Sequence, residues 1–346
     1  PFTAVEPSAG ACTPLGLGLL ASEAAFRAGL LHVTESATLG SDDEPIRASA
    51  LGLIPADRTR AERMAFLADH ALADLLTGIE LADCRRLGLF LALPDGAPEP
   101  GALAEALRPV LIDRLGQPPP RAAAFKRGRS GFFFALEQAL AALASDEYDA
   151  AIVGAVDSLC APEAMSALDR ERRLPAGAPL GGIIPGEAAA FILCEPAPAT
   201  RRALAIVRVV ATACEVFSRQ QEEPNRGEAL TDVLRALRGH PFGQGTRADL
   251  LYTCENGERF WAEELSLASL RNGSLIPEPF VRTMAAESFG DLGAAAGGVM
   301  LAMGLPALAA HAQADPATLL LVGSSDEGYV GACLVQGSSQ SPEAPP

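Results

Sequence analysis

Two segments of the sequence predict helices that are apolar on every side, and they constrain the fold more than any other feature. They read "GFFFALEQALAALA" over residues 131–144 and "LGAAAGGVMLAMGL" over residues 292–305. A helix that is apolar all round must be buried on every side. The glycines and alanines that open the second segment also allow another backbone to approach closely. The sequence therefore predicts two central helices, over residues 130–144 and 292–308, in the middle of the protein.

Short apolar runs between the helical segments predict buried strands. Four of them are "LGLFLAL" (87–93), "YDAAIVGAV" (148–156), "EAAAFILCEP" (187–196) and "TLLLVGS" (318–324). Strands that alternate with helices favour a mostly parallel sheet with both faces covered, in an α/β protein. The alternation starts again after "PAPATRR" (196–202), which predicts an N-terminal half at residues 1–198 and a C-terminal half at 199–337. The polar tail 338–346 is predicted to be mobile.

Charge and composition narrow the range of partners. The 346-residue chain has a formal net charge of −16, which argues against a nucleic acid or an anionic membrane as its partner. We find no run of eighteen apolar residues and no N-terminal signal pattern, and therefore expect a soluble, cytoplasmic protein. Seven dispersed cysteines suit a reducing compartment. The four histidines have no ligand spacing, so we expect neither a metal site nor a cofactor.

Five further stretches point to a family when they are taken in order. They are "AVEPSAGACTPLG", "YDAAIVGAVDSL", "GGIIPGEAAAFILCEP", "ESFGDLGAAAGGVMLAM" and "LLLVGSSDEGYVGACLV". Over nearly its whole length the chain resembles the β-ketoacyl synthases of the thiolase-like superfamily. The resemblance implies a duplicated five-layer α-β-α-β-α sandwich, with the two central helices as its middle layer. It also implies an acyltransferase activity in fatty acid or polyketide biosynthesis.

The catalytic residues of that family do not carry over to this chain. Arg129 stands where the family has its nucleophilic cysteine, while Asn256 and Asp291 stand where it has its two histidines. Glu327 falls at the position of the phenylalanine in the family's gating loop. Condensation needs a thiolate and donors that stabilise an enolate, and an arginine stays protonated. We therefore expect that the chain has no catalytic residues of this type and is a pseudoenzyme.

A guanidinium at the start of a helix needs a compensating charge. A cation at a helix N-terminus is unfavourable, and a buried unpaired charge costs several kcal/mol. Because the resemblance places Asp291 opposite the nucleophile position, we predict an Arg129–Asp291 ion pair within about 4 Å. Asn256 is expected beside it as a hydrogen-bond partner. The pair would act as a structural brace in the former pocket.

Three other features have both a functional and a structural interpretation. Lys126, Arg127 and Arg129 in "KRGR" are a candidate site for an anion or an acyl carrier protein, although short basic runs are more often solvated turns. Cys254 could be a relocated nucleophile, but as the end of a buried strand it fits an inert core cysteine better. The three aromatic residues 132–134 suggest that an acyl tunnel would be closed.

Four functions remain open on the sequence alone. The first is an inactive ketosynthase-like protein that acts as a structural or partner-binding subunit, as a homodimer or as a heterodimer with a ketosynthase or another protein. The apolar strand 151–156 is predicted to be its pairing edge. The second is a subunit of the chain-length-factor type, paired with an active ketosynthase. The third is an acyltransferase with a non-standard nucleophile, and the fourth is an accessory protein in bacterial effector secretion.

Overall fold

A computed structural model describes residues 5–77, 79, 81, 84, 86–95, 100–115, 122–175, 181–197, 205–219, 221, 223–311 and 315–338. The predicted boundary between residues 198 and 199 lies outside the described residues. So do residues 339–346 of the predicted tail.

Ten strands form one mixed sheet, in the order β10-β9-β11-β12-β8-β1-β7-β6-β4-β5. The first run holds β1 (Val5–Cys12), β4 (Leu87–Leu93), β5 (Ala122–Lys126), β6 (Ala150–Ser158) and β7 (Glu187–Pro196). The second holds β8 (Ala205–Cys214), β9 (Leu250–Thr253), β10 (Thr283–Met284), β11 (Thr318–Ser324) and β12 (Tyr329–Gly337). The two runs meet where Val5 of β1 pairs with Val207 of β8.

The two runs have the same topology. Within each run the strands lie in the order third, second, fourth, fifth, first. In each run the second strand pairs in parallel with the third and the fourth, and the fifth pairs antiparallel with the fourth and the first. The repetition confirms the duplicated α/β fold that the sequence predicted.

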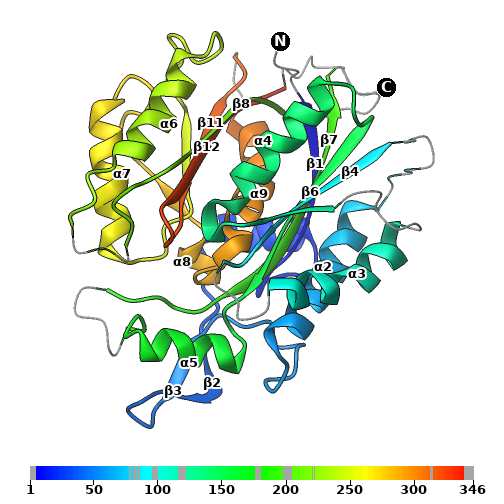
Figure 1. Cartoon of the computed structure of the whole chain (residues 1–346), viewed down its shortest axis with the longest axis vertical. Helices are drawn as coiled ribbons and strands as arrows, with labels where there is room; N and C mark the ends of the chain where they lie inside the picture. Colours follow the sequence, from blue (N-terminus) through cyan, green and yellow to red (C-terminus); the bar gives the residue numbers. More distant parts are fainter. Residues whose placement is uncertain are drawn as a thin grey trace.

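The helices form the remaining layers. They are α1 (Leu19–Arg27), α2 (Arg60–Leu75), α3 (Pro100–Leu115), α4 (Gly131–Ala144), α5 (Pro162–Arg170), α6 (Glu228–Gly239), α7 (Arg259–Arg271), α8 (Ala286–Phe289) and α9 (Ala296–His311). Two 3-10 turns, η1 (Gly128–Ser130) and η2 (Gly293–Ala295), lead into α4 and α9. Figure 1 shows α4 and α9 between the two runs, and both helices contact strands of both runs.

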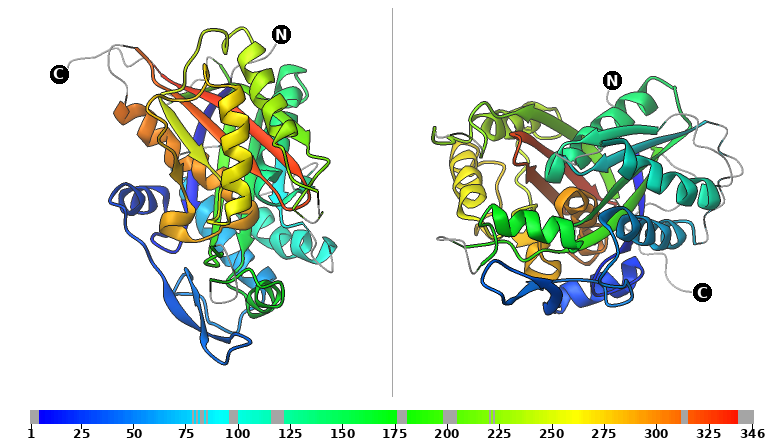
Figure 2. Two further views of the ribbon diagram at one scale, coloured as in Figure 1. Left: turned by 90° about the vertical axis from the view of Figure 1, so that its left-hand side faces the viewer. Right: turned by 60° about the horizontal axis from the view of Figure 1, so that its bottom comes forward.

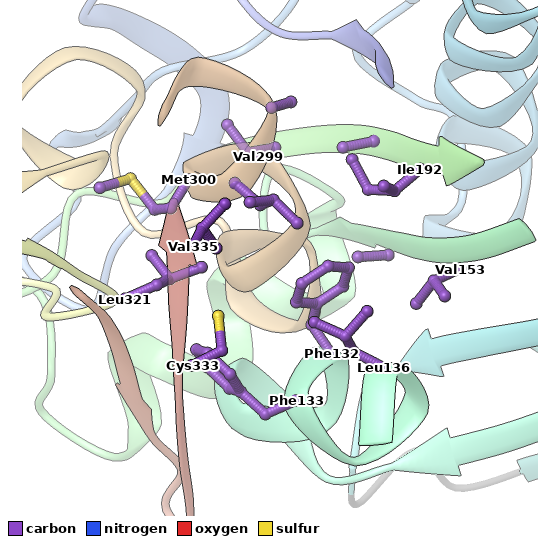
Figure 3. Close-up of a cluster of buried hydrophobic side chains, with 14 of the residues drawn as sticks. Phe132, Phe133, Leu136, Val153, Ile192, Val299, Met300, Leu321, Cys333 and Val335 are labelled. Atoms are coloured by element: carbon purple, nitrogen blue, oxygen red, sulfur yellow. The ribbon is translucent and has the colours of Figure 1, made fainter. Parts of the chain in front are cut away.

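Alternation along the strands explains the layers. In β6, Val153 and Ala155 face the central cluster with α4 and α9, while Ile152 and Val156 face the cluster under α2 and α3. The second run divides in the same way, with α6 and α7 over its outer face. Strands that are covered on both faces read as continuous apolar runs. The central cluster is drawn in Figure 3.

Helix α4 differs from the prediction that it is buried on every side. Phe134 and Glu137 are half-buried and Gln138 is exposed, so one stripe of α4 reaches the surface. Glu137 and Gln138 are the polar members of this stripe, and exposed Ala141 continues it. Helix α9 is buried from Ala296 to Leu305. The window Gly293–His311 has the length and hydropathy of a membrane span, but 72% of it is buried inside the protein, as in the core helix of a folded domain.

The predicted pairing edge over residues 151–156 is wrong. Strand β6 lies inside the sheet, hydrogen-bonded to β4 on one side and to β7 on the other. The ends of the described sheet are β5 and β10. A two-stranded sheet of β2 (Thr34–Leu39) and β3 (Pro45–Ala48) stands beside α5, away from the main body (Figure 2).

Candidate functional site

Arg129 lies in the tight turn that starts α4, with only 5% of its surface exposed. Its Nε donates to the Ser324 carbonyl oxygen at 3.1 Å, and its Nη2 lies 2.7 Å from Asp326 Oδ1. Its Nη1 lies 3.3 Å from Asp291 Oδ2, within the distance expected from the sequence. The guanidinium also stacks over the Trp261 ring, 4.5 Å from its centroid. Every nitrogen of this buried cation therefore has an acceptor.

Asp291 and Asn256 meet Arg129 from the second half of the chain. Asp291 follows the end of α8, and its Oδ1 accepts a hydrogen bond from the Gly293 backbone nitrogen at 2.8 Å, which caps η2. Asn256 follows β9, and its Nδ2 donates to Asp291 Oδ2 at 2.7 Å. The structure thus brings together Arg129, Asn256 and Asp291, the three residues that the resemblance singled out.

Three more side chains close these contacts into a ring. Asn256 Nδ2 also donates to Glu258 Oε2 at 3.0 Å, and Arg173 Nη2 lies 2.6 Å from the same oxygen. Arg173 Nη1 lies 2.5 Å from Asp326 Oδ2, and Asp326 Oδ1 leads back to Arg129. We call this closed circuit the charge ring; its members are Arg129, Arg173, Asn256, Glu258, Asp291 and Asp326.

The charge ring is close to electrically neutral and joins distant parts of the chain. Its two cations come from the loops around α4 and α5, and its three anions come from residues beyond 255. Arg219, on its edge, adds a third cation 3.1 Å from Glu258 Oε1. Trp261 covers Arg129 and donates from Nε1 to Glu258 Oε2 at 3.1 Å. A buried set of charges is tolerated when its members are paired in this way.

The pKa shifts keep the ring ionised. Burial by itself would raise the pKa of Asp326, but the charges of Arg129 and Arg173 outweigh it and hold that pKa well below its ordinary value. Burial likewise opposes the charge of Arg129, yet Asp326 and Asp291 raise the pKa of its guanidinium. Opposite charges at such short distances favour the charged forms. At neutral pH the ring therefore offers no free base.

Three ring members were not identified from the sequence. Asp326, and not its neighbour Glu327, faces Arg129; Glu327 is exposed at the tip of the turn. Arg173 and Glu258 lie in loops without a motif. The one available signal was the run "ENGER", because Glu258 stands two residues after the Asn256 that the resemblance had singled out.

The basic run "KRGR" does not form one cluster. Arg127 is half-buried, and its guanidinium lies between two aromatic rings, 4.2 Å from the Phe134 centroid and 4.5 Å from that of Tyr329. Arg129 belongs to the charge ring, and Lys126 ends β5. The three cations thus lie in different environments. The proposed anion or acyl-carrier site at "KRGR" has no converging set of donors in the described structure.

A small cavity of about 70 Å³ adjoins the ring, and Arg129, Arg173, Asp291 and Asp326 form part of its wall. On its other side Arg60 pairs with Asp157 at 2.7 Å. Asp95 also lines it, and Asp95 Oδ2 is buried without a hydrogen-bond partner. Burial and the nearby charge of Asp326 raise the pKa of Asp95 to about 6. The cavity is polar and about the size of a few water molecules.

No nucleophile and base are paired at this site. Cys254 is buried beside the ring, and burial raises the pKa of its thiol to about 12, so the reactive thiolate is scarce. Ser130 Oγ donates to the Arg127 carbonyl oxygen and shares a hydrogen bond with Ser325 Oγ, neither of which is a base. In the part of the chain that the structure describes, no group of three acidic, His or Cys side chains is arranged to hold a metal ion.

The fold is that of known ketosynthases. No protein-family model matches the chain. No curated protein matches it either. Among solved structures, the ishigamide ketosynthase/chain length factor aligns over 97% of this chain and 100% of its own, with a TM-score of 0.77 at 19% identity. A second structure is titled a type II polyketide synthase acyl carrier protein in complex with its ketosynthase. It aligns over 98% of this chain and 100% of its own, with a TM-score of 0.80 at 11% identity.

A third similar structure is the ketosynthase from module 6 of the bacillaene synthase of Bacillus subtilis 168. Its alignment covers 98% of this chain and 72% of the ketosynthase chain, with a TM-score of 0.75 at 13% identity. Together with the strand order, these matches define the class: the chain has the thiolase-like fold. Within that class it is similar to the ketosynthases and the chain length factor of polyketide synthesis.

Proposed function

We propose that this chain is a non-catalytic, ketosynthase-like subunit that acts by binding another protein. The observation that carries the proposal is the charge ring. Arg129, Asn256 and Asp291 occupy the positions of the nucleophile and the two histidines, and they are bonded to one another and to three further side chains. An acyl chain at this site would have to displace buried, paired charges, which is costly.

A direct test is an acylation assay on the whole chain. The protein is incubated with acyl-CoA and with an acylated carrier protein, and intact mass is measured; an active ketosynthase is treated in parallel as the positive control. We expect no covalent adduct. A stable adduct on one cysteine that disappears when that cysteine is replaced by alanine would overturn the proposal.

The surface that supports a partner-binding role lies at β5. This strand ends the sheet, pairs only with β4 among the described strands, and has exposed alanines at positions 122 and 124. A groove of about 330 Å³ runs beside it, and its lining includes Phe90, Ala123 and Tyr148 together with Gln138 and Ala141 of α4. An edge strand beside a groove of mixed polar and apolar lining is a surface onto which a further strand can pair.

The finer proposal is a subunit of the chain-length-factor type, whose partner is a ketosynthase. It is supported by the similar structures, one of which is titled a ketosynthase/chain length factor. Co-purification with a ketosynthase encoded nearby is the expected result. Recovery of the chain only as a homodimer would contradict the heterodimer and leave a non-catalytic subunit that pairs with itself.

The groove can be tested with a matched pair of substitutions. Ala141 is exposed on α4 and lines the groove, so Ala141→Arg should weaken the complex without disturbing the core. Ala24→Arg, at an exposed position of α1, adds the same charge to a helix elsewhere. Sedimentation should show a smaller species for Ala141→Arg only. Equal behaviour of both variants would exclude the groove as the contact surface.

A further inference from the structure

The ribbon of β2 and β3 packs against α5 through a hydrophobic cluster of its own. Ile46 of β3, Leu168 of α5 and Leu174 are buried members of this cluster, which is separate from the clusters of the main sheet. Figure 2 shows the ribbon and α5 beside each other at one end of the molecule. We call residues 34–48 and 162–175 the ribbon unit. Its own apolar core fixes the ribbon against the helix.

Hydrogen bonds also join the turn of the ribbon to the end of α5. The Ser41 nitrogen donates to Asp169 Oδ2 at 2.9 Å, and Ser41 Oγ donates to Asp169 Oδ1 at 3.3 Å. Within the turn, the Gly40 nitrogen donates to the Glu44 carbonyl oxygen at 2.9 Å, and the Glu44 nitrogen donates to Asp42 Oδ1 at 3.2 Å. The space between the ribbon and α5 is therefore preformed, which lowers the entropic cost of binding there.

A cavity of about 340 Å³ opens between the ribbon and the residues at the end of α5. Its apolar lining is made of Pro45, Ile46, Leu174 and Pro175. Ile46 and Leu174 are each only 6% exposed, so they form the floor. The cavity shares no lining residue with the cavity beside the charge ring or with the groove beside β5. It is a third, independent concave surface.

Carboxylates dominate the polar part of the lining. Glu35, Asp42 and Glu44 are exposed and Asp169 is half-buried, so they border the opening above the apolar floor. In the described part of the chain, Glu35, Asp42 and Glu44 form no ion pair. The one cation in the described lining is Arg47, which lies opposite Glu35 across the ribbon. Four carboxylates against one guanidinium leave a surplus of three negative charges at the opening.

An apolar floor with an acidic border complements a side chain that is apolar along its stem and positive at its tip. Lysine and arginine are built in this way. A second copy of this chain is a poor occupant, because each copy carries a formal charge of −16 and two acidic surfaces repel each other. The complementary occupant is therefore a basic segment of a different protein.

We infer that the cavity of the ribbon unit binds a basic segment of a partner protein, in which an arginine or lysine stands next to an apolar residue. The apolar parts of the segment pack on Ile46 and Leu174, and its positive charge lies among Asp42, Glu44 and Asp169. The inference rests on the proposed function in requiring a protein partner, and it adds the chemistry of the segment which that partner presents.

The test measures the binding of short peptides to the full chain by fluorescence anisotropy at low salt. The probe is acetyl-Gly-Arg-Leu-Arg-Gly-amide with an uncharged fluorophore. Two matched peptides carry serine in place of the leucine or glutamate in place of both arginines. We expect the probe to bind most tightly and the serine peptide to bind on the order of threefold more weakly, because it lacks the apolar contact. The glutamate peptide should not bind.

Glu44→Gln and Asp43→Asn separate the cavity from the overall charge of the chain. Each removes one negative charge from an exposed position of the same turn, but only Glu44 lines the cavity. Asp43 has a φ of 62°, which asparagine tolerates. Glu44→Gln should weaken binding of the probe about fivefold, and Asp43→Asn by less than about twofold. Salt at about 0.5 M should weaken binding to the wild type and reduce the difference between the variants.

Equal weakening by Glu44→Gln and Asp43→Asn would overturn the cavity as the site, because the probe would then respond only to net charge. Equal affinity for the leucine and serine peptides would exclude a role for the apolar floor, and no binding at low salt would exclude the site altogether. None of these readouts uses an acyl substrate or the groove beside β5, so their failure leaves the non-catalytic subunit standing. An acylated cysteine in the earlier assay would overturn that proposed function without changing the peptide result.

Discussion

Two buried arginines hold this protein together in different ways. Arg63 of α2 forms a two-pronged pair with Glu187 at the start of β7, with both contacts at 2.7 Å and with 2% and 0% of the side chains exposed. Arg129 divides its nitrogens among a carbonyl oxygen and two carboxylates of the charge ring. The first site is an isolated pair within the first run of strands, and the second is a network that joins both halves of the chain.

The difference lies in what happens when one member is lost. Glu187 also accepts from the Leu51 nitrogen and from Ser158 Oγ, but Arg63 is its one cationic partner among the described ion pairs. In the charge ring each carboxylate keeps a second partner: Arg173 for Asp326, and Asn256 for Asp291. Removing one member of an isolated pair leaves a buried charge without a counter-charge, which costs much stability. Removing one member of the ring costs less, because each remaining charge keeps another partner.

The largest expected effect is therefore at the isolated pair. Arg63→Met leaves a fully buried carboxylate without its counter-charge, and we expect it to lower the free energy of unfolding by about 3–5 kcal/mol. Urea unfolding followed by circular dichroism measures this. If Arg63→Met lowers the free energy of unfolding by less than Arg129→Met does, the isolated pair is not the more costly site to break.

Arg129→Met should cost less, about 1–3 kcal/mol, because Asp326 and Asp291 keep other partners. A double-mutant cycle sharpens this point. The coupling of Arg129 with Asp326, at 2.7 Å, should exceed its coupling with Asp291, at 3.3 Å. Arg129→Met with Asp291→Leu should not recover the lost stability, because Asp291 also caps η2. If that double variant regains the full stability of the wild type, Arg129 and Asp291 act as an isolated ion pair and not as members of a ring.

Much of this fold could be predicted from the sequence, and the site only in part. The two central helices were identified because a helix without a polar face has to lie inside. The contact of Arg129 with Asp291 and Asn256 could be predicted because the resemblance places these three residues in motifs around one pocket. The strand 151–156 was placed at an edge by mistake. Its uninterrupted apolar run fits a strand that is buried on both faces, which is what a central strand of this sheet requires.

The remaining ring members could not be predicted because they depend on the directions of side chains in loops. Asp326 and Glu327 are adjacent and equally acidic, yet the turn directs only the first toward Arg129. Arg173 and Glu258 are 85 residues apart and belong to no motif. Such contacts are set by the tertiary structure, and the charge pattern of the sequence does not contain them.

Asp95 extends the comparison to a carboxylate that forms no ion pair with another described residue and whose Oδ2 is buried without a hydrogen-bond partner. Burial and the nearby charge of Asp326 raise its pKa in the folded protein from the ordinary 3.8 to about 6, so the protonated form is favoured there. Its contribution to stability is therefore present at pH 4 and is lost as the pH rises through 6. Asp95→Asn should raise the free energy of unfolding at pH 7.5 by about 1–2 kcal/mol and leave it nearly unchanged at pH 4.

Unfolding curves recorded from pH 4 to 8 check this prediction. The isosteric substitution Asp326→Asn is the control, because the folded pKa of Asp326 is shifted in the opposite direction. Its destabilising effect should be nearly the same from pH 4 to 8, because a lowered folded pKa confines the loss of the effect to pH values below the ordinary pKa of 3.8. If the change in the free energy of unfolding depends on pH in the same way for both variants, the raised pKa of Asp95 is contradicted.

The smallest effect is expected at the rim of the charge ring. Arg219 lies 3.1 Å from Glu258, but its side chain is 29% exposed, so solvent and salt weaken the pair. Because Glu258 keeps Arg173 at 2.6 Å, Arg219→Gln should cost only about 0–1 kcal/mol at low salt and nothing measurable at 1 M salt. Arg259→Gln, which breaks an exposed pair with Glu263 on α7, is the matched control. If Arg219→Gln costs clearly more than this control and the cost survives high salt, the buried ring extends to Arg219, and its charges are balanced by three cations and not by two.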